Sequence, residues 1–175
     1  MGDGKAFMQG HHPKTKEDDF RTPNYILKWV EETYGKITHD GACSKDNAVS
    51  KAFDLFGNDN LTKGDVLFIN PPWNTEEVIK FVEAAAKQVK NGAIVVFLLP
   101  NKITEVSWVE QVDPWFAEVT ILGGRVDFSG PHSVKGGASR WGCIIATIGE
   151  HTHTHSIWSQ VTLKELKKRE KERIK

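Results

Sequence analysis

The sequence predicts a three-layer α/β fold built on a mostly parallel central sheet. Two apolar stretches of strand length, residues 65–69 and 93–99, show no alternation of polar and apolar side chains. Strands with that pattern are usually buried on both faces. Residues 75–90 between them carry apolar side chains at helical spacing. A buried strand, an amphipathic helix and a second buried strand predict a parallel βαβ unit.

The residues before this unit predict an arm, a helix and a short strand. Residues 1–18 are polar and aperiodic, which indicates a flexible N-terminal arm. Thr22 can cap a helix, Pro23 suits its first turn, and Gly35 suits its end. Residues 36–39 then have the length and composition of a short strand. This part of the chain should therefore add one helix and one strand to the sheet.

Polar side chains are expected to fix the start of two further helices. Asp40 enters a turn directly after the short strand, and Ser44 is expected to cap a short helix that runs to about residue 52. Asn74 or Thr75 should cap the helix of the βαβ unit. Both helices would then start near the carboxyl end of a strand.

The second half of the chain predicts further strands around one long loop. A weaker helix is expected at residues 105–112. The loop at residues 129–140 is rich in glycine, and loops of that length are often functional. A single domain, residues 19–160, would be followed by a charged helix or tail at residues 161–175. The expected strands are residues 118–122, 126–128 and 142–148.

The composition indicates a soluble protein with no fixed metal centre. The 175 residues include 23 basic and 23 acidic side chains, so nucleic-acid binding would have to come from a local patch. Cys43 and Cys143 have neither zinc-site spacing nor a disulfide framework around them. The sequence shows no apolar run of membrane-spanning length, so we expect a cytoplasmic location, no membrane and no metal.

The tetrapeptide Asn70-Pro71-Pro72-Trp73 follows the first buried strand and predicts chemistry on an amine. The Asn70 carboxamide oxygen and a carbonyl of the Pro71-Pro72 turn can accept the two hydrogens of an exocyclic amino group. Two acceptors favour its nucleophilic form and stabilise the charge that develops on methyl transfer. The prolines hold the turn rigid. Trp73 offers a face on which a flipped base can stack.

The alternative interpretation is a strand that simply ends in a turn, because Asn and Pro are common turn residues. The position of the tetrapeptide favours a site. Asn70 and Asp40 both lie at the carboxyl ends of expected strands, where open α/β sheets bind their ligands. Asp40 could also cap only its own turn, and that reading stays open from the residues alone.

The order of several motifs resembles the phage-type DNA N6-adenine methyltransferases. The resemblance covers residues 19–149, most of the chain. It implies a Rossmann-like fold that binds S-adenosylmethionine and a DNA substrate. The matching segments, in order, are Asp19-Phe20-Arg21-Thr22-Pro23, Asp40-Gly41-Ala42-Cys43, Asn47-Ala48, Asp59-Asn60-Leu61, Asn70-Pro71-Pro72-Trp73, Leu98-Leu99-Pro100 and Gly124-Arg125-Val126-Asp127-Phe128.

The resemblance also implies where the cofactor would be held. Asp54 competes with Asp59 for the adenosine moiety, because both lie between the first strand and the tetrapeptide strand. The family often has Tyr or Phe in place of Trp73, and the cofactor loop lacks a full glycine-rich motif. The expected contacts are Phe20, Thr22 and Pro23 at the methionine end, Asp40, Gly41 and Ala42 in the loop after the first strand, Asp59 at the adenosine, and Asn70.

Three basic residues are the candidates for DNA contact: Arg125, Lys135 and Arg140. A structural salt bridge for Arg125 and a solvated loop for the other two are the alternatives. The three alternating histidines of residues 151–155 are best explained as one polar face of an exposed strand rather than as a metal site. We expect residues 101–140 to carry a short or relaxed sequence specificity.

The tetrapeptide leaves the acceptor open. Cytosine N4, an RNA base and a glutamine side chain present the same kind of amine to Asn70. A non-catalytic module that binds cofactor or DNA is a further alternative, because the cofactor loop is short of glycines. We expect a monomer or homodimer, which in a phage-encoded case would act in the host cytoplasm as part of restriction-modification or genome regulation.

Overall fold

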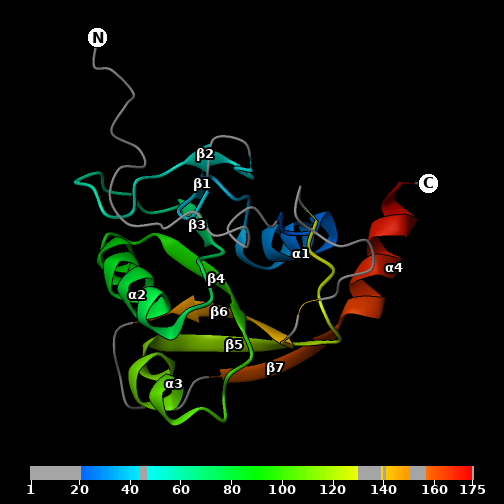
Figure 1. Cartoon of the computed structure of the whole chain (residues 1–175). Helices are drawn as coiled ribbons and strands as arrows, with labels where there is room; N and C mark the ends of the chain where they lie inside the picture. The colour runs from blue at the N-terminus through cyan, green and yellow to red at the C-terminus, as the bar shows by residue number, and fades with distance from the viewer. Residues whose placement is uncertain (1–20, 44–46, 130–138, 140, 150–156, 175) are drawn as a thin grey trace.

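The computed structural model describes residues 21–43, 47–129, 139, 141–149 and 157–174. Within them the chain forms four α-helices and a seven-stranded sheet (Figure 1). The helices are α1 (Asn24–Tyr34), α2 (Thr75–Lys90), α3 (Val106–Gln111) and α4 (Leu163–Arg173), with a 3-10 turn at Asp113–Trp115. The strands are β1 (His39–Asp40), β2 (Lys51–Ala52), β3 (Val66–Ile69), β4 (Ile94–Pro100), β5 (Phe116–Gly123), β6 (Cys143–Ile148) and β7 (Ile157–Thr162).

The sheet is mixed, which corrects the expectation of a mostly parallel sheet. Its strand order is β2-β1-β3-β4-β6-β5-β7. The neighbours from β2 to β4 pair in parallel, as does β5 with β7. Strand β6 runs antiparallel to both β4 and β5. Strand β6 therefore lies between two strands of the opposite direction, which the apolar pattern of its residues does not reveal.

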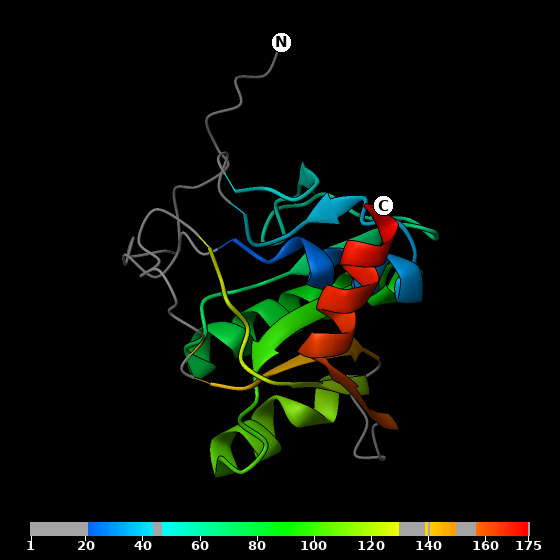
Figure 2. The same cartoon turned by 90° about the vertical axis from the view of Figure 1, so that its right-hand side faces the viewer.

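Helices cover both faces of this sheet, as the sequence predicts. On one face, Phe81 of α2 and Trp108 of α3 pack against alternate residues of β3 and β4 such as Leu67 and Phe97. A second apolar cluster fills the other face, where α1 and α4 lie against each other (Figures 1 and 2). Because both faces of β3 and β4 are covered, these strands need apolar side chains at every position.

The βαβ unit forms as predicted. Asn74 caps α2: its side-chain oxygen accepts the backbone N–H of Glu76 at 2.9 Å. Glu76 and Glu77 lie in the first turn, and Lys90 lies in the last, which suits the helix dipole. The helix α1 also forms, with Gly35 at its end at φ +104°. The predicted Thr22 cap is wrong: Pro23 occupies the N-cap position of α1 and no side chain caps that end. The cap of α2 and the glycine end of α1 are the local signals that the structure confirms.

The predicted helix that ends near residue 52 is wrong in its described part. Residues 47–50 form turns and bends, and Lys51–Ala52 is strand β2. The Ser50 hydroxyl donates to the carbonyls of Ile37 and Thr38 at 2.9 Å each, which ties this segment to the residues before β1. Contacts with the neighbouring strand therefore override the local capping signal, and Ser44 itself lies outside the described residues.

The predicted strand at residues 126–128 is also wrong. Gly124 has φ +122°, a left-handed conformation that follows the end of β5. The next residues form no ladder among the described residues, apart from a single antiparallel bridge between Ser129 and Arg21. Strand β7, by contrast, was not predicted. The expected N-terminal arm, residues 1–18, lies outside the described residues.

The C-terminal helix belongs to the core. Leu163 and Leu166 of α4 are buried against the cluster that includes Ile26 and Val30 of α1. The charged side chains of α4 are exposed or partly exposed, and one of them, Glu170, pairs with Lys28 of α1 at 3.8 Å. Among the helices of the described residues, none is long and apolar enough to cross a membrane.

Candidate active site

The carboxyl ends of three neighbouring strands place polar loops at one edge of the sheet. Strand β1 ends at Asp40, β3 ends just before Asn70, and β4 ends at Pro100. Asp40 pairs with Phe68 in the parallel register of β1 and β3. Ligands of open α/β sheets bind at this edge. The fold therefore brings Asp40 and Asn70 to the same side, as the sequence predicts.

Two hydrogen bonds hold the Asn70 side chain. Its Nδ2 donates to Thr22 Oγ1 at 3.3 Å, and its Oδ1 accepts the Trp73 Nε1–H at 3.2 Å. An indole nitrogen can only donate, so the carboxamide oxygen must face Trp73 and the amide nitrogen must face the Thr22 hydroxyl. Among the described residues no second donor reaches Oδ1, so one of its lone pairs is available to a ligand. Asn70 is thus held in one orientation with an acceptor to offer.

Phe128 and Ser129 close the other side of this turn. The rings of Trp73 and Phe128 meet edge to face, with centroids 5.3 Å apart and an interplanar angle of 76°. Ser129 bridges Arg21 through two backbone hydrogen bonds of 2.5 and 3.3 Å, beside Thr22. Segments near residues 22, 70 and 128 therefore meet at one site. Sequence reasoning gave Phe128 no role, because it read that segment as a strand.

The Asp40 carboxylate organises the loop that follows β1. Its Oδ1 accepts the backbone N–H of Ala42 and its Oδ2 accepts that of Val49, both at 3.1 Å. Burial raises the pKa of Asp40 above its usual range, and these N–H bonds oppose that shift. Both oxygens of the carboxylate already have partners. Asp40 thus shapes the loop, and the backbone of that loop faces the edge of the sheet.

Gly41 allows this loop to lie close to β3. A Cβ at Gly41 would come within 3.2 Å of the side chains of both Ile69 and Leu67. A larger residue would push the loop away from the strand that delivers Asn70. The small residues of the Asp40-Gly41-Ala42 turn therefore have a packing reason, which the sequence signalled only through the family resemblance.

The structure separates the two candidate adenosine ligands. Asp54 follows the carboxyl end of β2, and its Oδ1 accepts the backbone N–H of Phe56 at 3.2 Å. The carbonyl of Asp59 accepts Gln88 Nε2 at 3.3 Å, near the end of α2. Because α2 runs from the carboxyl edge back to the start of β4, Asp59 lies at the opposite, amino-terminal edge. It lines a polar cleft there with His39 and other residues.

The remaining candidates are placed only in part. Arg125 is exposed on the segment after β5, and Pro23 precedes α1 beside Thr22. Phe20, Lys135, Arg140 and the histidines of residues 151–155 lie outside the described residues. Across the described part of the chain, no group of three or more His, Cys, Asp or Glu side chains is placed to hold a metal ion. Pro71, Pro72 and Trp73 form the turn between β3 and α2.

The fold and site define an α/β protein with an Asn-Pro-Pro-Trp turn at the carboxyl edge of its sheet. The family model described as DNA N-6-adenine-methyltransferase (Dam) matches residues 9–172. The chain belongs to this family. Family membership agrees with the resemblance drawn from the ordered motifs of the sequence.

A curated relative agrees with this assignment. The DNA N-6-adenine-methyltransferase of Escherichia phage T1 is 25% identical over 123 residues, which cover 61% of this chain and 51% of the phage protein. The chain thus spans about half the length of the curated relative it matches.

Proposed function

We propose that this protein transfers a methyl group from S-adenosylmethionine to the exocyclic N6 amine of adenine in DNA. Family membership and the activity named for the phage T1 relative support the reaction. The observation that carries the proposal is the Asn70 side chain, oriented by Thr22 and Trp73 with a free lone pair on Oδ1. In a phage-type enzyme the reaction would take place in the cytoplasm of the host.

The residues at the carboxyl edge fit S-adenosylmethionine. The parallel strands β2-β1-β3-β4 support a Rossmann-like arrangement of the part of the sheet that would bind the cofactor. The loop of Gly41 and Ala42, fixed by Asp40, offers backbone groups to the methionine end together with Thr22 and Pro23. Asp54 stands at the end of the next strand, where its carboxylate suits the hydroxyl groups of a ribose. We therefore assign the adenosine to Asp54 rather than to Asp59.

Asn70 would act on the amine. When bound, S-adenosylmethionine supplies an electrophilic methyl group: the N6–C bond forms as the S–C bond breaks, and the electron pair of that bond stays on sulfur. The free lone pair of Asn70 Oδ1 accepts one amine hydrogen, and a carbonyl of the Pro71-Pro72 turn accepts the other. Both acceptors stabilise the positive charge that develops on N6. The surplus proton then leaves the methylated amine for solvent.

Trp73 would contribute twice. Its indole N–H fixes the Asn70 carboxamide, and its ring, supported edge-on by Phe128, gives the flipped adenine a surface on which to stack. Most of the rate enhancement would then come from positioning and electrostatics, with no general base required.

The acceptor is tested by incubating the full chain with S-adenosylmethionine labelled in its methyl group. Three parallel reactions contain plasmid DNA free of N6-methyladenine, total RNA, or a protein mixture. We expect label in DNA alone, and N6-methyladenine as the only labelled nucleoside after digestion. Labelled N4-methylcytosine, or label in RNA or protein instead of DNA, would replace the proposed acceptor with another amine.

A further inference from the structure

Trp141 is a large apolar side chain exposed at the carboxyl edge of the sheet. The residue is 43% exposed and lies two positions before β6. Because β6 runs antiparallel to β4, the start of β6 lies beside the end of β4, where Cys143 pairs with Pro100. The backbone N–H of Asn101 donates to the Gly142 carbonyl at 2.8 Å. Trp141 therefore belongs to the same edge as Asn70.

The structure holds this exposed residue in place. The Ser139 hydroxyl donates to the Trp141 carbonyl at 2.7 Å and accepts its backbone N–H at 3.2 Å. The ammonium of Lys102 lies over the indole, 5.8 Å from the ring centroid, and 6.0 Å from the ring of the buried Trp108. Lys102 thus stands between a core indole and an exposed one. Because the ring is already held in place, it loses little conformational entropy when a flat ligand stacks on it.

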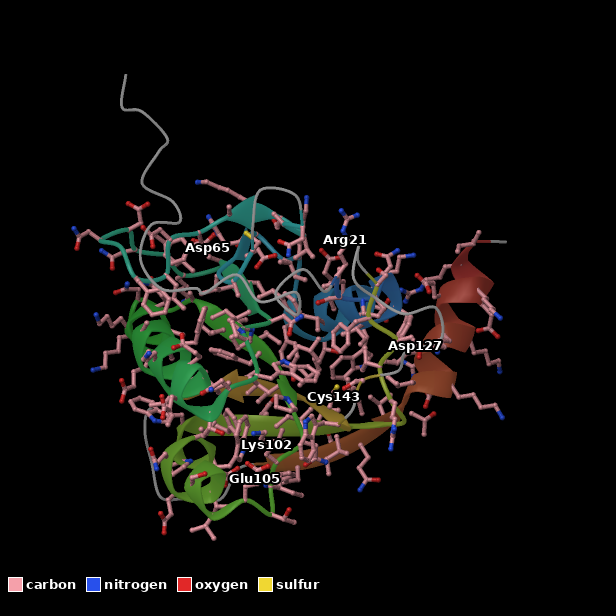
Figure 3. All side chains as sticks on the ribbon, viewed as in Figure 1. Arg21, Asp65, Lys102, Glu105, Asp127 and Cys143 are labelled. Carbon is pink, nitrogen blue, oxygen red and sulfur yellow. The ribbon has the colours of Figure 1, made fainter. Side chains whose placement is uncertain are left out.

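Lys102 also connects Trp141 to the tetrapeptide turn. Its ammonium donates to the Oγ1 of Thr75, at 3.3 Å, and pairs with Glu105 at 3.2 Å. Thr75 lies two residues after Trp73, and Figure 3 labels Lys102 and Glu105 near one another. The strand order β1-β3-β4-β6 places the cofactor loop on one side of Asn70 and Trp141 on the other. Trp141 therefore lies on the side of Asn70 away from the proposed cofactor.

We propose that Trp141 stacks on a DNA base next to the flipped target adenine. The inference rests on the proposed function, since it places the DNA on the side of Asn70 opposite the cofactor. A base beside the gap left by flipping has lost one stacking neighbour and presents an open face. Stacking on an indole is tolerant of sequence and needs no net positive charge. That suits a chain whose formal charge is zero.

The experiment compares Trp141→Ala and Trp141→Phe with a matched control. Trp158 is also 43% exposed, but it lies on β7, the edge strand farthest from the cofactor loop. For plasmid DNA free of N6-methyladenine, we expect Trp141→Ala to raise the KM roughly tenfold, the scale of one lost base stack. Trp141→Phe should stay near the wild-type KM because it keeps an aromatic face. Trp158→Ala should match the wild type.

Two further measurements separate stacking from structure. Trp141→Leu keeps apolar bulk without an aromatic face, and we expect its KM to rise like that of the Ala variant. The Kd for S-adenosylmethionine and the Tm should remain unchanged in every Trp141 variant that shows the higher KM.

Other outcomes would overturn the inference. If DNA is methylated with the wild-type KM by both Trp141→Ala and Trp141→Leu, the stacking role is wrong while the proposed function stands. Equal losses in Trp141→Phe and Trp141→Leu would also reject it, because only one of them lacks the aromatic face. If the wild-type chain methylates no DNA, the proposed function itself has failed.

Discussion

At the scale of single residues, the central site consists of side chains that are far apart in the sequence. The tetrapeptide was recognisable because Asn70 follows a continuous apolar strand and precedes a capped helix. Its hydrogen bond with Thr22 was not predictable, since 48 positions separate the two residues. The ring contact between Trp73 and Phe128 was not predictable either, because it depends on the path that the chain takes after β5. Periodicity and capping report local structure and contain no information about contacts between segments that are far apart in the sequence.

Trp73 provides a test of how Asn70 is oriented. Trp73→Phe keeps an aromatic ring and removes the N–H donated to Asn70 Oδ1. One neutral hydrogen bond contributes about 0.5–1.5 kcal/mol, so we expect kcat to fall by roughly three- to tenfold with little change in the KM for DNA. Steady-state kinetics with labelled S-adenosylmethionine measure both constants. Trp158→Phe is the control for loss of an indole elsewhere, and an unchanged kcat in Trp73→Phe would show that Thr22 alone orients Asn70.

The two cysteines should be unreactive in the folded protein. Burial, with a smaller effect from the charge of Asp40, raises the pKa of Cys43 to about 12, and burial raises the pKa of Cys143 to about 11. The thiolate is the nucleophile, and at pH 8 both groups lie well below their pKa values, so both remain thiols. Iodoacetamide at pH 8 should modify neither cysteine until denaturant unfolds the chain, as mass spectrometry can follow. Rapid native modification of Cys43 would mean that the loop after β1 opens in solution.

At the scale of secondary-structure elements, the sequence predicted those whose signals are local. The βαβ unit, α1 and α3 formed near the predicted residues, although the predicted Thr22 cap of α1 did not form. The segment around residues 47–52 did not become a helix, because it forms hydrogen bonds with β1 and the residues before it. The Val49 N–H donates to the Asp40 carboxylate, and the Ser50 hydroxyl donates to the Ile37 carbonyl. Strand β7 is an edge strand with an exposed Trp158, so it lacks the apolar pattern of β3 and β4.

The helix α4 illustrates an element whose composition hides its role. Its charged residues indicate a solvated tail, yet Leu166 is buried against α1 and the sheet. Leu166→Ala should lower the free energy of unfolding by about 2–5 kcal/mol, because it leaves a cavity in a packed core. Denaturant titration followed by circular dichroism measures the change. Lys168→Ala, on the exposed face of the same helix, should stay within about 0.5 kcal/mol of the wild type. Equal stability of the two variants would show that α4 is not part of the cooperative core.

At the scale of the whole molecule, a formal net charge of zero limits how the protein can hold DNA. Few phosphate contacts give a shallow dependence of affinity on salt. Arg125 is exposed on the segment between β5 and the Ser129 bridge, and we propose that it contacts a phosphate. Arg125→Ala should weaken DNA binding about equally for all sequences and reduce the salt slope by about one.

Fluorescence anisotropy with two labelled duplexes of different sequence, over a range of NaCl concentrations, tests this role of Arg125. Lys168→Ala removes a positive charge from α4 and serves as the control, with the salt slope of the wild type. A loss confined to one of the two duplexes would assign Arg125 to base recognition instead.

The measurement that tests the central claim most directly compares wild type with Asn70→Ala in two assays. Isothermal titration with S-adenosylmethionine should give nearly the same Kd for both proteins, because Asn70 is proposed to act on the amine. Transfer of labelled methyl to DNA should fall about 100-fold or more in Asn70→Ala, the usual loss when a transition-state acceptor is removed. Full transfer activity in Asn70→Ala would contradict the account.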